Sequence, residues 1–163
     1  MKSIKTDKMN TSMESTILYR LAIASDLNAI VNIENNCFET EKFNRRQLSY
    51  LMFKAKGCCF VAVDEDKIVG YISLLQHKRR NNLRIYSLAV DKSAQRKHIG
   101  QGFIDIAKAY AKENKLSSIT LEVRLDNSAA LSLYKRNGFL EEEILPNYFK
   151  YNIDAFRMKV SIE

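Results

Sequence analysis

The chain has 163 residues, of which 46% are hydrophobic and 28% are charged, a balance that excludes an intrinsically disordered chain and fits one folded domain. Lysine and arginine outnumber aspartate and glutamate by 26 to 19, and the formal net charge of +7 points to an anionic partner: nucleic acid, a membrane surface or a phosphate-bearing small molecule. No stretch approaches the ~20 uninterrupted apolar residues of a membrane span, and the N-terminus lacks the apolar segment of a secretory signal, so we expect a cytoplasmic protein without a membrane partner.

The first half of the chain predicts a short strand, two helices and a hairpin. Residues 1–15 are polar and without period, so we expect a flexible tail there and a folded domain over 16–163. The predicted elements are a strand over 17–22, a helix that Ser25 or Asp26 caps and that runs to Phe38, a helix over 44–54, and strands over 58–63 and 68–75 joined by the turn 64–67.

The second half continues with one more strand of the meander and then alternates helix and strand. Together the two halves predict a single α/β domain with a mixed sheet. The elements expected here are a strand over 83–90, an amphipathic helix over 98–114, a strand over 117–123, a helix over 127–137 closed by Gly138, and strands over 139–145 and 155–160.

A polar loop between the strand that ends at Val90 and the following helix is the first candidate site. The backbone N–H groups at a helix start are unpaired and favour anions, and Gly100 and Gly102 carry no Cβ that would keep a phosphate away. Arg96 and Lys97 add positive charge. The pattern is neither a dinucleotide fingerprint nor a P-loop, and the alternative is an ordinary helix start with glycines for close packing.

A second candidate site combines a strand carboxylate with a helix phenol. Glu122 and Tyr134 could act as general base and general acid if the fold brings them together. The alternatives are a partly exposed strand carboxylate and an amphipathic residue packed on the sheet. Asn127 would then be no more than the cap of its helix.

The cysteines and histidines give no sign of a metal site or a disulfide framework. Cys58 and Cys59 are adjacent, Cys37 stands alone, and neither His77 nor His98 has zinc-ligand spacing with them. We therefore expect reduced, packing cysteines and no metal.

The loop QRKHIG and the segment LEVRLDNSAALSLYKRNGF, with RIYSLAV before them and NYFKYNIDAFRMKV after them, resemble the GNAT superfamily of N-acetyltransferases, most closely its bacterial RimI type. The resemblance covers residues 17–160. It implies a mixed, mostly antiparallel sheet of six to seven strands with about four helices, splayed between the fourth and fifth strands. His98 stands where the family's loop has its first glycine, which is a departure from the pattern.

The resemblance also implies acetyl-CoA as cosubstrate and a role for each matching residue. Glu122 would take a proton from the incoming ammonium, directly or through water, and Tyr134 would reprotonate the CoA thiolate. A strand N–H near Leu88 or Ala89 would stabilise the oxyanion, and Asn127 would contact the reactive end of the cofactor. The expected cofactor-binding residues are Leu88, Ala89 and Val90 along the pantetheine arm, then Gln95, Arg96, Lys97, His98, Ile99, Gly100, Gln101 and Gly102 at the pyrophosphate, and Asn127.

The acceptor stays open between two classes of amine. The RimI-type resemblance implies the N-terminal α-amine of a protein, such as a ribosomal protein, with Tyr148 and Tyr151 flanking its first residues. A small amine such as a polyamine or an aminoglycoside is the alternative. A nucleic-acid-binding module would also explain the charge, but no nucleic-acid motif is present, so we do not expect nucleic acid. A monomer and a homodimer are both compatible with the sequence.

The excess of positive charge is concentrated in one segment. Between Lys78 and Lys97 seven side chains are basic, and only Asp91 is acidic. Because this segment contains the predicted cofactor strand and loop, we expect its charge to serve the phosphates of CoA, whereas Lys78 to Arg80 could also be a solvated loop or touch a ribosomal surface.

Overall fold

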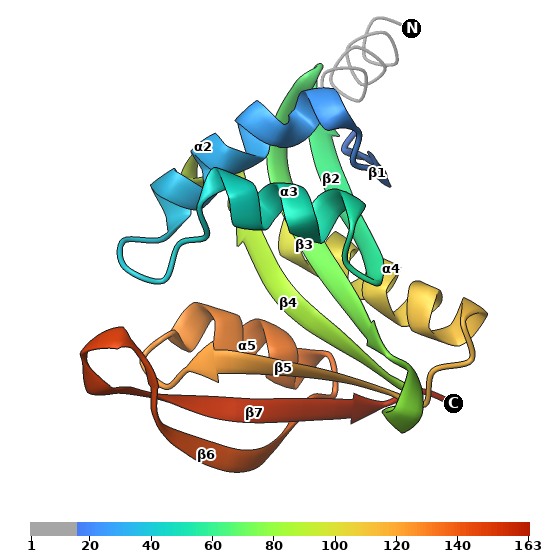
Figure 1. Ribbon diagram of the computed structural model, residues 1–163, viewed down its shortest axis with the longest axis vertical. Helices are drawn as coiled ribbons and strands as arrows, with labels where there is room; N and C mark the ends of the chain where they lie inside the picture. The colour runs from blue at the N-terminus through green and yellow to red at the C-terminus, as the bar shows by residue number, and fades with distance from the viewer. Residues whose placement is uncertain (1–15) are drawn as a thin grey trace, which may run out of the picture.

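The computed structural model describes residues 16–163, and its seven strands form one sheet in the order β1-β2-β3-β4-β5-β7-β6 (Figure 1). The tail expected over 1–15 lies outside the described residues. The strands are β1 (Leu18–Leu21), β2 (Gly57–Asp64), β3 (Lys67–His77), β4 (Asn82–Val90), β5 (Ser118–Arg124), β6 (Leu140–Phe149) and β7 (Ile153–Ser161), and the helices are α2 (Leu27–Cys37), α3 (Arg45–Phe53), α4 (Ile99–Glu113) and α5 (Ser128–Arg136).

The local signals of the sequence explain most of these boundaries. The Asn44 side chain accepts the N–H of Gln47 and begins α3 with a capping box, and Gly138 follows α5 with a φ of 88°. Glu65 and Asp66 both adopt positive φ in the two-residue turn between β2 and β3, as a tight hairpin requires. The α-helices and the meander are therefore confirmed.

The expected cap of α2 is different in the structure. Asp26 occupies the N-cap position but makes no capping hydrogen bond. Its carboxylate instead accepts two hydrogen bonds from the Arg20 guanidinium, at 2.7 and 3.0 Å, and one from the N–H of Ile23. An ion pair with β1 has replaced the local cap, and this ion pair lowers the pKa of Asp26.

The sheet opens between β4 and β5, as the GNAT resemblance implied. These two strands run parallel but pair at only three positions, with Asn82 opposite Ser118, Leu83 opposite Ile119 and Arg84 opposite Thr120. Beyond Arg84 they diverge, so the sheet has the shape of a V with β5, β6 and β7 in its lower arm (Figure 1). The last six residues of β4 therefore lack β5 as a hydrogen-bonding neighbour along the inner edge of the V.

A β-bulge in β4 changes which side chains face which layer. Ser73 of β3 pairs with Ser87, but Leu74 pairs with Ile85, so Tyr86 is the additional residue. Before the bulge Ile85 packs in the α4 core, whereas after it Ala89 packs against α2. The bulge thus turns Ser87 toward the α2 layer at the point where the V begins to open.

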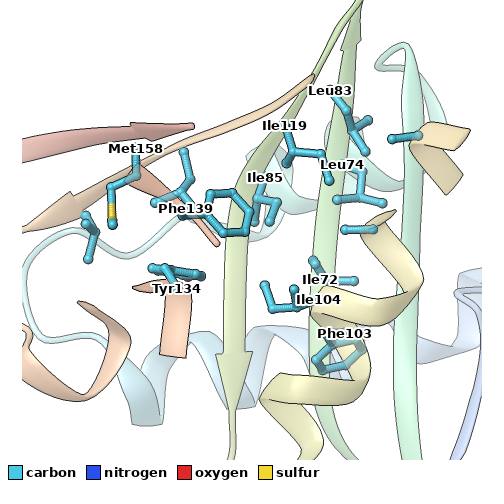
Figure 2. Packing of buried hydrophobic residues seen from close by; sticks show 14 of the residues in the cluster. Ile72, Leu74, Leu83, Ile85, Phe103, Ile104, Ile119, Tyr134, Phe139 and Met158 are labelled. Carbon is cyan, nitrogen blue, oxygen red and sulfur yellow. The ribbon is translucent and has the colours of Figure 1, made fainter. Parts of the chain in front are cut away.

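Two hydrophobic cores hold the helices on opposite faces of the sheet. The larger core lies under α4 and α5, and Figure 2 shows its residues gathered from β3, β4, β5, β7 and both helices. The smaller core packs α2 and α3 on the other face of β2, β3 and β4 through Ile30, Ile33 and Leu48. None of the described helices has the length and apolar character that a membrane crossing requires.

Candidate active site

A cavity of about 900 Å³ occupies the opening between β4 and β5. It is bounded by β4, β5, α5, the loop between α2 and α3, and the turn between β6 and β7. Its volume is in the range of sites for large organic ligands. Of the cofactor-binding, catalytic and acceptor-side residues expected from the sequence, those that line it are Leu88, Val90, Gln95, Gly100, Glu122, Asn127, Tyr134 and Tyr151.

The loop before α4 adopts the conformation that a glycine would favour. His98 has φ 57° and ψ 29°, the left-handed region, which glycine adopts without strain and a histidine adopts less often. The start of α4 then leaves the N–H groups of Ile99, Gly100 and Gln101 without carbonyl partners inside the helix, because no preceding turn exists. Such a helix start next to the cavity suits an anionic group.

Gly102 differs from the expectation that it leaves room for a phosphate. Its N–H donates to the His98 carbonyl, and a Cβ at this position would lie 2.1 Å from the Tyr19 hydroxyl oxygen. The glycine is therefore required for the packing of β1 against α4. Gly100 lines the cavity, and a Cβ there would meet Leu133 Cδ2 at 3.1 Å.

The other residues of the predicted loop have varied surroundings. Arg96 is exposed, and the Lys97 ammonium forms an ion pair with Asp64. The Gln101 side chain exchanges two hydrogen bonds with Asn137 and so ties α4 to α5. The side chains of Ile99 and Ala89 are buried in the two cores, so only their backbone groups could meet a ligand.

Substitution of His98 tests the conformation of this loop. We expect His98→Val to destabilise the fold by about 1–2 kcal/mol, since a β-branched side chain is poorly tolerated at positive φ. His98→Gly should have nearly wild-type stability, because relief of the left-handed strain offsets the greater entropy of glycine in the unfolded chain. Thermal unfolding, with and without acetyl-CoA, measures the stability of both variants. Equal melting temperatures for His98→Val and His98→Gly would argue against strain at His98.

Glu122 lies on the face of β5 opposite to α4 and α5, where its carboxylate contacts two arginines. Arg84 Nε donates to its Oε2 at 2.9 Å, and Arg157 Nε approaches its Oε1 at 3.4 Å. The carboxylate is largely buried, with 8% of its side chain exposed. A carboxylate has about four acceptor positions, so lone pairs are left for a ligand in the cavity.

Tyr134 reaches the cavity from the opposite layer. Its ring packs edge-on against Phe139 with 5.6 Å between the centroids (Figure 2), and burial raises the pKa of its hydroxyl to about 12. The phenol is therefore protonated at neutral pH and can only give a proton away. Asn127 caps the same helix by accepting the N–H of Ala130 at 3.1 Å.

Two loops complete the wall of the cavity. Glu41, between α2 and α3, accepts two hydrogen bonds from Arg124 Nη1 at the end of β5, at 2.9 and 3.1 Å. On the other side Tyr151 lines the cavity, whereas the Tyr148 hydroxyl accepts a hydrogen bond from Arg84. The Arg124–Glu41 contact thus joins the two arms of the V across its mouth.

The positive segment is less concentrated around the cavity than its position in the sequence suggested. The turn Lys78–Arg80 precedes β4 and the loop 91–98 follows it, so nine residues, or about 30 Å of strand, separate them. In addition, Arg84 pairs with Glu122 and Lys97 with Asp64. The charge available to a ligand in the loop therefore comes mainly from Lys92 and Arg96 and from the start of α4.

Several groups that line the cavity or contact its lining residues could not be found from the sequence. Arg157 occupies an alternating position on a half-exposed strand, as many charged residues do. Arg84 belongs to the positive segment, and no sequence pattern links it to Glu122. Glu34, Tyr71 and Ser87 form a buried hydrogen-bonded set, and the only signal was a glutamate within an apolar helix face.

Cys58 and Cys59 have the surroundings of packing residues, whereas Cys37 lines the cavity and its thiol contacts the Val90 carbonyl at 3.2 Å. Burial raises the pKa of Cys58 to about 11 and that of Cys59 to about 12, so neither thiol is a nucleophile at neutral pH. Among the described residues, no three His, Cys, Asp or Glu side chains gather closely enough to hold a metal ion.

The same chain has clear relatives. The model of the acetyltransferase (GNAT) family matches residues 27–139. An uncharacterized N-acetyltransferase of Methanocaldococcus jannaschii is 30% identical over 143 residues, which are 87% of this chain and 90% of that protein. The N-alpha-acetyltransferase MAK3 of Arabidopsis thaliana is 31% identical over 113 residues, covering 68% of this chain and 60% of that protein.

Structural comparison agrees with these matches. The ribosomal-protein-S18-alanine N-acetyltransferase of Escherichia coli superposes with a TM-score of 0.83 over 91% of this chain and 95% of its own, at 21% identity, a likeness of fold. The chain belongs to the GNAT acetyltransferase family, and it is an acetyl-CoA-dependent N-acetyltransferase.

Proposed function

We propose that this enzyme transfers the acetyl group of acetyl-CoA to the N-terminal α-amine of a protein. The observation that carries the proposal is one cavity that contains a strand carboxylate, Glu122, and a protonated phenol, Tyr134, from opposite layers of the sheet. Relatives named N-alpha-acetyltransferase support the choice of acceptor.

The residues present fit acetyl-CoA, which would supply the activated acetyl group. The inner edge of β4 after Arg84, which β5 does not pair, offers backbone donors and acceptors to an extended amide-containing chain, in the manner of an added strand; at its end the Val90 carbonyl also accepts the Cys37 thiol at 3.2 Å. The start of α4, with left-handed His98 and Gly100 at the cavity, suits the pyrophosphate. We assign the pantetheine arm to Leu88–Val90 and the pyrophosphate to the N–H groups at the start of α4.

The residues on the other side of the cavity suit an amine. An ammonium is not nucleophilic until it has lost a proton, and Glu122 is the carboxylate proposed to take it. Arg84 and Arg157 fix the orientation of this carboxylate through one contact on each oxygen. Tyr134 is proposed to give its proton to the departing thiolate, and the N–H of Leu88 or Ala89 to stabilise the developing oxyanion.

A panel of acceptors tests the proposal. The protein is incubated with acetyl-CoA and a set of peptides with free N-termini, with spermine and with kanamycin, while release of the CoA thiol is followed and products are identified by mass spectrometry. We expect turnover on peptides and acetylation of the α-amine.

The matched control is each active peptide with its N-terminus blocked and an internal lysine retained. Turnover of the blocked peptide would shift the assignment to a lysine ε-amine, and turnover of only spermine or kanamycin would replace the proposal with a small-amine acetyltransferase.

A further inference from the structure

Among the carboxylates that line the cavity, Glu34 is not used by the mechanism above and is the most buried. Glu34 of α2 is buried, with 1% of its surface exposed, and none of the described basic side chains forms an ion pair with it. Its Oε2 accepts the N–H of Phe43 at 2.8 Å, which holds the loop between α2 and α3. Its Oε1 is left for another partner.

That partner is a chain of two hydroxyl groups that leads back to the cavity. The Tyr71 hydroxyl of β3 donates to Glu34 Oε1 at 2.5 Å and lies 2.8 Å from Ser87 Oγ. Ser87 lines the cavity because the bulge at Tyr86 turns it toward this layer. The three groups therefore connect the cavity wall to a buried carboxylate.

The carboxylate determines the direction of the hydrogen bonds in this chain. An ionised carboxylate can only accept, so Tyr71 gives its proton to Glu34 and must accept the proton of Ser87. The lone pairs of Ser87 Oγ are then the outer end of the chain. Burial raises the pKa of Glu34, which favours the protonated form that this chain of hydrogen bonds would produce.

Acetylation of an ammonium requires a second proton acceptor. The nitrogen loses two protons in total, one before it attacks and one as the new C–N bond forms. Glu122 is proposed to take the first, and each of its oxygens is also in contact with an arginine. We propose that Ser87, Tyr71 and Glu34 form a relay that carries the second proton away from the acceptor nitrogen.

The relay step is balanced. As the C–N bond forms, the nitrogen–hydrogen bond breaks and the proton bonds to Ser87 Oγ; the Ser87 proton passes to Tyr71 Oη, and the Tyr71 proton passes to Glu34 Oε1. The nitrogen keeps its electron pair as an amide, and Glu34 becomes a neutral acid. After product release the reverse sequence returns this proton to the cavity, where it restores the Tyr134 phenol. The proton taken by Glu122 is the one released to water, so the whole reaction frees one proton. This inference rests on the proposed amine acetylation.

The test uses three variants of the full chain and a matched control. Ser87→Ala removes the outer hydroxyl, Tyr71→Phe removes the middle one, and Ser87→Thr restores a hydroxyl at the outer position. The control is Ser73→Ala, since Ser73 is the strand partner of Ser87, is also buried, and has no hydrogen-bond partner for its hydroxyl among residues 16–163. Each variant is measured with the acceptor on which the wild type is most active.

We expect Ser87→Ala and Tyr71→Phe to lower kcat by about tenfold or more, with the acetyl-CoA-induced rise in melting temperature unchanged. Ser87→Thr and Ser73→Ala should stay within about twofold of the wild type. In mixtures of H2O and D2O, a plot of the wild-type rate against the fraction of D2O should be curved, because several protons move together. The same plot for Ser87→Ala should be linear.

The relay is overturned if Ser87→Ala behaves like Ser73→Ala in rate and in its D2O dependence, while the wild type is active; the proposed function then stands. If the wild type acetylates no amine in the panel, the proposed function and the relay are both rejected. A Tyr71→Phe protein that does not fold leaves the decision to Ser87→Ala and Ser87→Thr, whose side chains lie at the cavity wall and change by a single small group.

Discussion

Replacement of Glu122 by glutamine is expected to lower kcat/KM for the acceptor amine by about 10²- to 10⁴-fold, the range for loss of a general base. Glutamine preserves the shape of the side chain and can still accept a hydrogen bond from Arg84, but it cannot take a proton. The loss should be largest at low pH, where the fewest acceptor amines are already deprotonated. Affinity for acetyl-CoA, measured by titration against melting temperature, should be nearly unchanged.

The matched control for this substitution is Glu143→Gln. Glu143 forms an ion pair with the same Arg157 but is half exposed on β6 and does not line the cavity. A surface pair of this kind contributes about 1 kcal/mol or less, so the control should retain activity. Equal activity of both variants across the pH range would mean that Glu122 only anchors arginines.

Replacement of Tyr134 by phenylalanine is expected to lower kcat by about ten- to a hundredfold, at or below the lower end for loss of a general acid, because a thiolate is a fair leaving group even without protonation. Phenylalanine keeps the packing on Phe139, so the fold and the affinity for acetyl-CoA should be retained.

The raised pKa of Tyr134 also predicts how kcat of the wild-type enzyme depends on pH. Because burial raises this pKa to about 12, the folded enzyme keeps the phenol protonated well above pH 10, so kcat should show no loss from Tyr134 ionisation between about pH 7 and 10. The matched control for Tyr134→Phe is Tyr110→Phe. Tyr110 lies on α4, and its hydroxyl accepts a hydrogen bond from Gln76 outside the cavity. Similar rates for both variants would remove Tyr134 from the chemistry.

The order and type of the elements could be predicted because each depends on neighbours close in the sequence. The apolar spacing of α4, the capping box at Asn44 and the left-handed Gly138 are all local signals. β6 extends beyond the predicted end at Leu145, to Phe149. Between these two residues its pairing with β7 is irregular, and because β6 lies at the edge of the sheet the missing N–H of Pro146 is tolerated there.

The composition of the site could be predicted only in part. Glu122 and Tyr134 both line the cavity, as the resemblance implied, but their partners come from distant strands. Arg84 lies 38 residues from Glu122 in the chain, and Tyr71 lies 37 residues from Glu34. No pattern within one segment reports such a contact, because it depends on which strands become neighbours.

The net positive charge of the chain contributes less to the cavity than the sequence suggested. By itself the sequence pointed to an anionic partner, and it predicted the mixed α/β sheet and the segments that line the cavity, because composition, periodicity and turn residues act locally. Only the tertiary structure decided where the charge is used. The pairing of β4 with β5 placed Arg84 on Glu122, the β2–β3 turn placed Asp64 on Lys97, and the bulge at Tyr86 turned Ser87 toward a buried glutamate.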